Sequence, residues 1–247
     1  PAHLWYASRV QQLPMALFGI ALAGALLPPL SRAARSDDHA RFGSLLCFAL
    51  ERSYLLIFSC TCLLFFGGYS VIDLLFGHGE FSDTDALHTT HCLWAYSAGL
   101  LPIVWILITA SAFYARGDYQ TPTKAALAGM GTNVAANTLC IGVFGAGAWS
   151  VAAATSVAAF VNAGWLLQAL IKQGYFQWST ELSRRLQKST VSCIAATLAA
   201  LAFLSVLPNF YTKGSTTQNL IDCVGLGLVY TGVLAGLEWK KRSGQFA

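Results

Sequence analysis

A single arginine near the start of the chain has the chemistry of an anion ligand. Arg9 lies in a short polar run, and an apolar run over residues 13–30 follows it. A guanidinium stays charged at physiological pH and offers a planar fork of donors that matches phosphate oxygens. If Arg9 faces a water-filled cavity, it can bind an anion there, with Gln11 and Gln12 extending the polar lining. The alternative is an interfacial arginine that reaches the membrane surface along its aliphatic stem.

Two amides and a hydroxyl form a second candidate site in the middle of the chain. Asn133 and Asn137 are four residues apart, so on a helix both side chains lie on the same face. Thr155 lies in the next apolar run, which a short connection makes antiparallel and adjacent. Amide and hydroxyl oxygens can coordinate Na⁺, and polar sites of this kind occur near the midplane of transporters. The same residues can instead form interhelical hydrogen bonds.

Two further groups carry charge or titrate. Glu51 and Arg52 are adjacent inside an apolar run, where consecutive helical side chains point about 100° apart and do not pair with each other. They are either coupling groups or structural charges held by other partners. Asp85, His88 and His91 form a D-x-x-H-x-x-H pattern, whose side chains could hold a metal from one helical face. Nothing nearby completes a metal shell, so we expect a solvated helix start and no metal site.

The composition places these residues in a membrane protein. Of the 247 residues, 55% are hydrophobic and 11% are charged, and the mean hydropathy is +0.56. Soluble domains carry about 25% charged residues, so this chain has too few charges to cover a soluble fold. The net charge of +4 is too small to indicate a nucleic-acid partner. The seven cysteines are scattered through apolar runs, which favours buried small side chains over a disulfide framework.

Seven apolar segments are long enough to cross a bilayer as helices, and none has the period-two alternation of a barrel strand. We therefore predict an all-α, polytopic bundle of about seven transmembrane helices. Pro102 predicts a kink in the third helix, and Ser82 or Asp83 is its expected N-cap. Gly67-Gly68 should end the second helix before a short segment, 71–76. The predicted spans comprise residues 13–30, 42–66, 83–114, 124–143, 150–171, 190–207 and 220–239.

The basic residues predict an orientation. If the loops alternate between the two sides, twelve of the fifteen Lys and Arg residues fall on one side, and Lys213 lies on the other with Glu80, Asp83 and Asp85. By the positive-inside rule the basic side is cytoplasmic, so the start of the chain is external and its C-terminus is cytoplasmic. The sequence contains no nucleophile with a matched base, no carboxylate pair and no phosphate-cradling glycine loop. The residues themselves therefore indicate no catalytic site.

Three stretches, taken in order, resemble the motifs of one family. YASRVQQLPMALFGIALAGALLPPLSR, which begins at Tyr6, is similar to Y-A-D-R-x-x-Q-x-P-x-x-x-F-G-I-A-L…L-L-P-x-L-S of the MurJ (MviN) family of lipid II flippases. LFGHGEFSDTDALHTTHCLWAYSAGL and FYARGDYQTPTK resemble two later motifs of the same family. These motifs cover roughly residues 5–124, and beyond them the resemblance is one of span pattern.

The resemblance implies a fourteen-span exporter of the multidrug/oligosaccharidyl-lipid/polysaccharide superfamily, with two helical lobes around a cavity. This chain would supply the second lobe (residues 1–172, five spans) and a two-span extension (residues 173–247) with a groove for the lipid tail. Its first residue is Pro1, so we expect a piece of a longer protein that also contains the N-terminal lobe. The implied cargo is lipid II, an undecaprenyl-diphosphate-linked disaccharide-pentapeptide. It would cross the bacterial cytoplasmic (inner) membrane by alternating access, among membrane lipids.

The resemblance also implies roles for single residues. The family arginine falls on Arg9, which would contact the diphosphate, with Gln12 and Ser8 as further substrate-binding residues beside it. The preceding family aspartate is Ser8 here, so the carboxylate that could orient the arginine is absent. No cofactor is expected apart from coupling to Na⁺ or to the membrane potential. Some relatives bind Na⁺ in this lobe, and the nearest match here is Asn133, Asn137 and Thr155.

Two alternatives remain open from the sequence. The first is an exporter of another lipid-linked oligosaccharide or of drugs within the same superfamily; an apolar cavity with a carboxylate would favour drugs. The second, more distant, is a membrane enzyme that acts on polyprenyl phosphates. Such an enzyme would need clustered acidic residues for Mg²⁺, and the acidic residues of the basic side are scattered.

Overall fold

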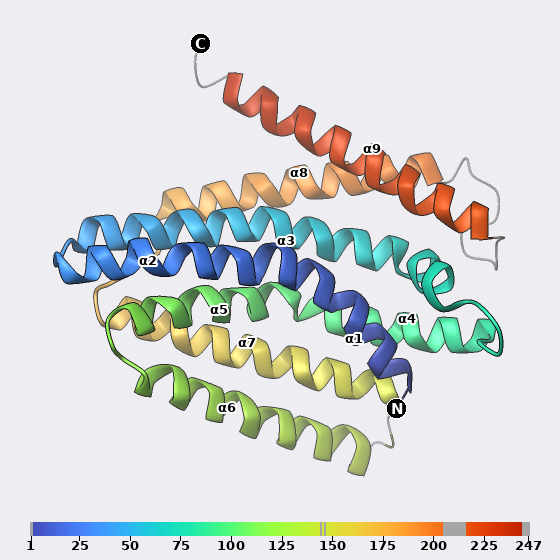
Figure 1. Ribbon diagram of the computed structural model, residues 1–247, viewed down its shortest axis with the longest axis horizontal. Coiled ribbons are helices and arrows are strands. Elements are labelled where there is room, and N and C mark those ends of the chain that lie inside the picture. The colour runs from blue at the N-terminus through green and yellow to red at the C-terminus, as the bar shows by residue number, and fades with distance from the viewer. Residues whose placement is uncertain (1, 144, 146, 205–215, 244–247) are drawn as a thin grey trace.

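The computed structural model describes residues 2–143, 145, 147–204 and 216–243. Over these ranges the chain forms seven helical rods that run back and forth along one long axis (Figure 1). The described ranges contain helices, turns and bends but no strand. The predicted all-α bundle is confirmed.

The first rod changes its helical type at a proline. It consists of α1 (Ala2–Pro14), the π-helical turn η1 (Met15–Ile20) and α2 (Ala21–Arg35). Pro14 has no backbone N–H and its ring crowds the carbonyl four residues earlier, which disturbs the regular ladder where the π turn begins. Gly19 lies in this turn, and a Cβ there would be 2.7 Å from a methyl group of Val104. The glycine therefore permits close packing of this rod on α5.

The second rod is one continuous helix, α3 (His39–Phe76), of 38 residues. At about 1.5 Å per residue it is roughly 57 Å long and exceeds the full thickness of a bilayer. The break predicted at Gly67-Gly68 is wrong, because both glycines lie buried inside the helix. A Cβ on Gly67 would be 2.6 Å from Leu226, and one on Gly68 would be 3.2 Å from Leu93. These glycines allow neighbouring helices to approach.

The third rod is divided into α4 (Asp83–Ala98) and α5 (Leu100–Ala115). Ser82 is its N-cap, as predicted: the Asp85 N–H donates to Ser82 Oγ (3.2 Å), and the Ser82 N–H donates back to the Asp85 carboxylate (3.0 Å). The predicted kink appears as an interruption at Gly99. Its position follows from Pro102, whose ring would clash with the carbonyl of residue 98 in an unbroken helix.

The remaining rods complete the antiparallel bundle. Residues 124–143 are helical, as predicted. Within the described ranges, the other six rods are long and apolar enough to cross a membrane, and the rod over residues 120–143 is not among these candidates. α8 begins ten residues earlier than residue 190, so the basic residues 184, 185 and 188 are helical. The predictions for residues 205–207 and Lys213 lie outside the described residues. These rods are α6 (Gln120–Asn137) with η2 (Thr138–Val143), α7 (Ala148–Lys172), α8 (Thr180–Leu204) and α9 (Thr216–Ser243).

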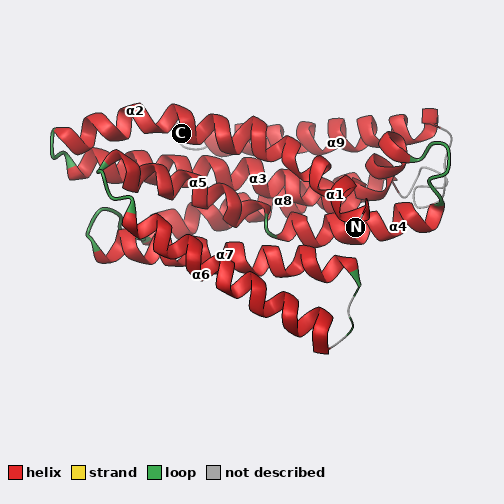
Figure 2. Cartoon of the chain, turned by 60° about the horizontal axis from the view of Figure 1, so that its bottom comes forward, coloured by secondary structure: helices red, strands yellow, loops and turns green. Residues whose placement is uncertain are grey.

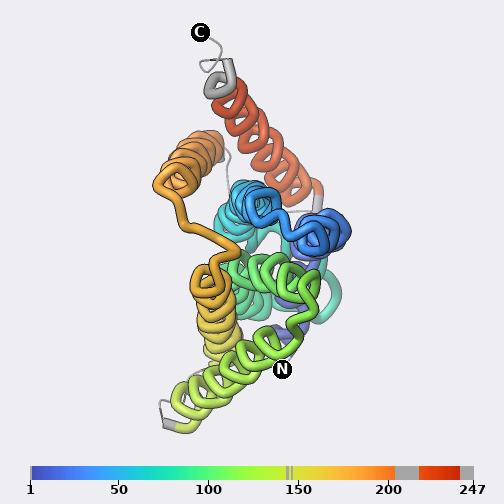
Figure 3. The backbone as a smooth tube through the Cα atoms, turned by 90° about the vertical axis from the view of Figure 1, so that its left-hand side faces the viewer, coloured from blue at the N-terminus to red at the C-terminus, as the bar shows by residue number. Residues whose placement is uncertain are grey.

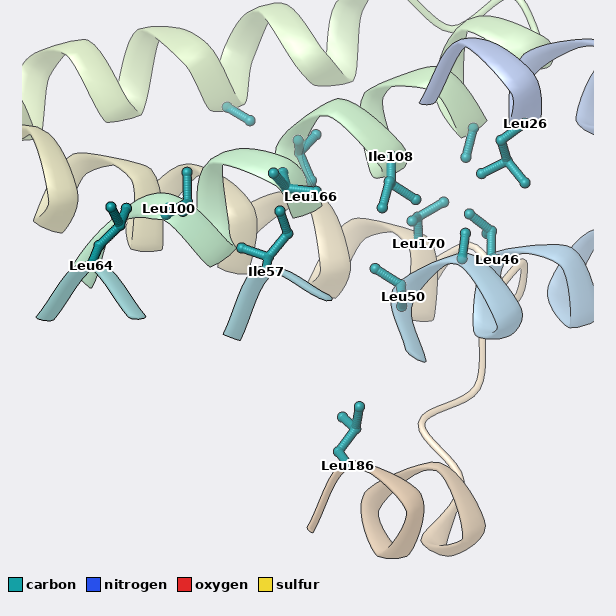
Figure 4. Packing of buried hydrophobic residues seen from close by; sticks show 14 of the residues in the cluster. Leu26, Leu46, Leu50, Ile57, Leu64, Leu100, Ile108, Leu166, Leu170 and Leu186 are labelled. Atoms are coloured by element: carbon teal, nitrogen blue, oxygen red, sulfur yellow. The ribbon is translucent and has the colours of Figure 1, made fainter. Parts of the chain in front are cut away.

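α3 is the central element of the packing. It contacts α1, α2, α4, α5, α8 and α9, whereas α6 packs mainly on α7 and α9 mainly on α8 and α3. Seen end-on, α6 and α9 lie at opposite edges of the bundle (Figure 3). A second, smaller cluster around Ala196, Leu226 and Tyr230 joins α8 and α9 to α3. Figure 4 shows the main core, in which leucines and isoleucines of α3, α5 and α7 meet, among them Leu50, Ile57, Leu100, Ile108, Leu166 and Leu170.

The connections gather at the two ends of the bundle (Figures 1 and 2). Residues 36–38, 116–119 and 173–179 lie at one end, and residues 77–82 lie at the other with the N-terminus. The alternation that the charge argument requires is therefore present among the connections that the structure describes. Arg35 ends α2, Arg116 follows α5 and Lys172 ends α7, so these basic residues lie at the first end, which we call the basic end.

Candidate functional site

Arg9 lies on the face of α1 that points away from the core. Ala7 and Val10 are buried, whereas Arg9 is exposed. The buried Gln11 donates from Nε2 to the carbonyl oxygen of Tyr96 (2.9 Å), which fixes the rotation of α1 against α4. The core side of α1 is thus defined by Gln11, and the arginine faces outward from it.

The guanidinium of Arg9 has two described neighbours. Its Nη1 donates to Gln12 Oε1 (3.2 Å), and its Cζ lies 4.9 Å from the centroid of the Trp5 ring. No carboxylate lies within ion-pair distance of Arg9 in the described part of the chain. Ser8 Oγ donates instead to the Trp5 carbonyl (2.8 Å). The geometry leaves a charged fork facing outward, supported by a half-exposed indole.

The structure brings Arg9 and Gln12 together. The expectation that Gln11 extends the same polar lining is wrong, because Gln11 is buried and donates to the Tyr96 carbonyl. Trp5 is a neighbour that the sequence reasoning missed. The signal was present, because an indole four residues before an arginine lies on the same helical face and can stack under it. An arginine held over an aromatic ring loses less conformational freedom when it binds an anion. The arrangement can hold an oxyanion with charge-assisted hydrogen bonds.

The predicted amide cluster is also assembled, at the contact between α6 and α7. Asn137 Nδ2 donates to Asn133 Oδ1 (2.9 Å), and Asn133 Nδ2 donates to Thr155 Oγ1 (3.2 Å). The Thr155 hydroxyl donates to the Val151 carbonyl (3.0 Å). Asn137 Oδ1 is buried without a hydrogen-bond donor among the described residues. This oxygen is the group of the cluster best placed to accept a cation.

Glu51 and Arg52 have separate partners. Arg185 of α8 donates from Nη1 to Glu51 Oε2 (3.3 Å) and from Nε to Glu181 Oε1 (3.0 Å). The guanidinium of Arg52 lies 5.5 Å from the centroid of the Phe48 ring. The ion pair of Glu51 with Arg185 thus joins α3 to α8. The sequence reasoning missed this pair because it assigned residue 185 to a loop.

The histidines lie together at the end of the bundle opposite the basic end. His3 Nδ1 is 3.1 Å from Thr89 Oγ1 and its Nε2 is 3.7 Å from the Asp85 carboxylate. The rings of His3 and His88 have centroids 5.8 Å apart, and those of His88 and His91 are 6.4 Å apart. Among the residues described, no group of three or more His, Cys, Asp or Glu side chains has a geometry that could hold a metal ion.

A buried carboxylate at the α3–α9 contact was not singled out from the sequence. Asp73 is 5% exposed and accepts a hydrogen bond from Asn219 Nδ2 (2.7 Å). Asp222 is 1% exposed and accepts from Gln218 Nε2 (3.0 Å). A lone aspartate inside the apolar segment 71–76 was the available signal. Asn219 satisfies Asp73 and so links the start of α9 to the end of α3.

The long apolar helices define a class: a polytopic α-helical membrane protein. The solved structure of lipid II flippase MurJ in an inward closed conformation matches with a TM-score of 0.77 and 22% identity, over 97% of this chain and 47% of that one. An inward-facing multidrug resistance MATE family transporter of the MOP superfamily matches with a TM-score of 0.56 and 17% identity, over 95% of this chain and 57% of that one. These likenesses show the fold.

Sequence comparison gives the family. The model described as lipid II flippase MurJ matches residues 1–221, so the chain belongs to the MurJ family. A probable lipid II flippase MurJ of Vibrio cholerae is 27% identical over 234 residues, covering 94% of this chain and 44% of that protein. Another, of Rhizobium meliloti, is 33% identical over 205 residues, covering 82% of this chain and 37% of that protein. The chain therefore spans less than half the length of these relatives.

Proposed function

We propose that this chain is the C-terminal part of a lipid II flippase, which moves the lipid-linked peptidoglycan precursor across the cytoplasmic membrane. The observation that carries the proposal is the position of Arg9, which is exposed on the outer face of α1 with no carboxylate within ion-pair distance in the described residues. The names of the relatives supply the cargo class.

In this proposal Arg9 is the anion ligand for the diphosphate. The guanidinium binds phosphate oxygens, Gln12 extends the donor set, and Trp5 limits the rotamers of the arginine. The N-terminal lobe of the same protein faces α1 and completes the wet cavity. Rocking of the two lobes gives alternating access while the polyprenyl tail stays in the bilayer. No covalent bond is made or broken, so the protein is a transporter.

The finer assignments are part of the same proposal. Residues 1–172 form the second lobe, and residues 173–247 form the extension with a groove for the lipid tail. The basic end of the bundle is cytoplasmic, since it collects most of the Lys and Arg residues. Coupling uses Na⁺ at Asn133, Asn137 and Thr155 or the membrane potential acting on charges in the cavity.

The test is complementation of a flippase-depleted strain by the whole protein with Arg9→Ala. We expect loss of growth and loss of lipid II exposure on the outer surface. Arg35→Ala is the matched control, because it removes an exposed arginine from the opposite end of the same rod and should complement. Growth of the Arg9→Ala strain at normal membrane levels of the protein would overturn the assignment of Arg9.

Substitutions of Trp5 distinguish a role of α1 in anion binding from a purely structural role. Trp5→Phe keeps a ring under the guanidinium and should retain most activity. Trp5→Ala should lower flipping about twofold to thirtyfold, since cation–π contacts contribute about 0.5–2 kcal/mol. A deficit of Trp5→Ala that is equalled by Trp5→Phe would contradict the stacking role.

A further inference from the structure

A row of three imidazoles lies opposite the basic end, at the end of the bundle that holds the N-terminus and the start of α4 (Figure 1). His3 comes from α1, and His88 and His91 lie on one face of α4. The ring centroids of His3 and His88 are 5.8 Å apart, and those of His88 and His91 are 6.4 Å apart. Histidine is the side chain whose ordinary charge change falls between pH 5 and 8. The row therefore places three such groups at the contact between α1 and α4.

Two open cavities give water access to the row. The first, of about 540 Å³, lies between the start of α1, the end of α3 and the connection over residues 77–82, and His3 is part of its wall. The second, of about 430 Å³, is lined by all three imidazoles together with the start of α7. Protons can therefore reach each ring while the helices stay packed.

The charged groups around the row are few. Asp85 of α4 has its carboxylate 3.7 Å from His3 Nε2, and it also accepts hydrogen bonds from the Ser82 side chain and backbone at the N-cap of α4. The lining residues that α3 and α7 contribute to the two cavities are uncharged. The other titratable residues that line these cavities are Tyr6, His78, Glu80 and Cys92.

Protonation has opposite effects along the row. A proton on His3 creates an ion pair with Asp85 across the contact between the two helices. His88 and His91 have no carboxylate within ion-pair distance among the described residues, so their protons add uncompensated charge beside His3. Like charges about 6 Å apart repel, and the repulsion is stronger near a protein surface than in bulk water. The fully protonated row therefore pushes α1 away from α4.

We propose that the histidine row is a pH-sensitive contact, which holds the start of α1 on α4 while the imidazoles are neutral and releases it when they are protonated. Gln11 holds the next part of α1 through its hydrogen bond to the Tyr96 carbonyl, so the release is confined to the first turns of the helix. Trp5 and Arg9 lie in these turns and move with them. The contact does not depend on the proposed function, whereas any effect of its release on transport does.

The test is hydrogen–deuterium exchange of the whole protein in nanodiscs without cargo, at about pH 7.5 and about pH 5, corrected for the intrinsic pH dependence of exchange. The backbone amides of residues 4–10 should exchange about threefold faster or more at the lower pH, since one pair of unit charges about 6 Å apart gives this factor even in bulk water. His88→Asn/His91→Asn leaves the ion pair of His3 and should exchange equally at both pH values. His39→Asn, which removes an exposed histidine at the basic end, should behave like wild type.

A second variant has the opposite expected effect. Asp85→Asn keeps an acceptor for the N-cap of α4 but removes the carboxylate beside His3, so the acceleration at the lower pH should exceed that of wild type. Equal exchange of the wild type at both pH values, or an acceleration that persists in His88→Asn/His91→Asn, would overturn the proposal. So would a smaller acceleration in Asp85→Asn. Because exchange is measured without cargo, a failure of the flippase assignment would leave these results unchanged.

Discussion

The guanidinium of Arg116 lies 3.6 Å from the centroid of the Tyr175 ring and 5.7 Å from that of Phe42. The rings of His39 and Phe42 also contact Tyr175: that of His39 is stacked on it, with centroids 5.8 Å apart and an interplanar angle of 5°, and that of Phe42 meets it edge-on, with centroids 6.1 Å apart. The contact therefore joins the start of α3 to the α5–α6 and α7–α8 connections, which are distant from it in sequence. This contact links segments at the basic end of the bundle.

Replacement of Arg116 by Ala should destabilise this end. A cation–π contact with two rings contributes about 1–2 kcal/mol where it is partly desolvated, so the melting temperature of the whole protein in detergent should fall by several degrees. Tyr175→Phe keeps the ring face and should melt like wild type, whereas Tyr175→Leu should match Arg116→Ala. Equal melting of Tyr175→Leu and Tyr175→Phe would contradict the role of the ring.

The bridge between Glu51 and Arg185 can be tested with a double-mutant cycle. Both Glu51→Gln and Arg185→Gln should lower the unfolding free energy, and the coupling between them should be about 0.5–1 kcal/mol, because the Arg185 side chain is 54% exposed. Flipping by the single variants should follow their stability. If either variant stops flipping while its melting temperature is unchanged, Glu51 is a coupling group and the structural reading of the bridge is wrong.

Helix type, helix number and the alternation of loops follow from the sequence because they depend on local apolar runs and on charge. The break at Gly99 could also be predicted from the sequence, since Pro102 disturbs the helical turn that precedes it. The continuity of α3 through Gly67-Gly68 could not be predicted. These glycines are needed for close contact with Leu226 and Leu93, which lie far away in sequence. Turn propensity and close helix packing use the same residue, and contacts alone distinguish them.

The candidate sites also divide into those that depend on residues close in sequence and those that depend on distant partners. Arg9 with Gln12 and the pair Asn133 with Asn137 are local, three or four residues apart, and periodicity is enough to place them on one face. The partners of Glu51 and Asp73 are 134 and 146 residues away, so no local pattern could supply them. An isolated charge in an apolar run predicts that a partner exists but does not identify it.

Asp118, in the connection before α6, gives a pH-dependent prediction. Burial alone would raise the pKa of this carboxyl, but hydrogen bonds from the Thr121 side chain and backbone outweigh it and lower the pKa below its ordinary value of 3.8. The contribution of Asp118 to the free energy of unfolding is therefore complete at pH values above 3.8 and is lost as the pH falls through the lower pKa of the folded state. Asp118→Ala should cost about 1 kcal/mol at neutral pH.

The control for this prediction is Asp118→Asn, which keeps one acceptor for the Thr121 N–H. It should cost less than Asp118→Ala at neutral pH. Unfolding free energies measured between neutral pH and pH about 3 should show wild type and Asp118→Asn converging at the acid end. A constant gap between them across that range would show that the charge of Asp118 is not what stabilises the start of α6.

The amide cluster gives a prediction for Na⁺. Because Asn137 Oδ1 is buried without a described donor, a cation that binds there would satisfy it and stabilise the native state. At a Na⁺ concentration about ten times the dissociation constant, the gain is about 1.4 kcal/mol, which a melting curve resolves. The whole protein should therefore melt higher in NaCl than in KCl of equal strength, and Asn137→Ala should remove the difference. Asn162→Ala is the matched control, since Asn162 Oδ1 is also buried without a described donor but lies beside Gly129, outside the cluster. If wild type melts equally in both salts, the three residues form an interhelical hydrogen-bond network, and coupling must then come from the membrane potential.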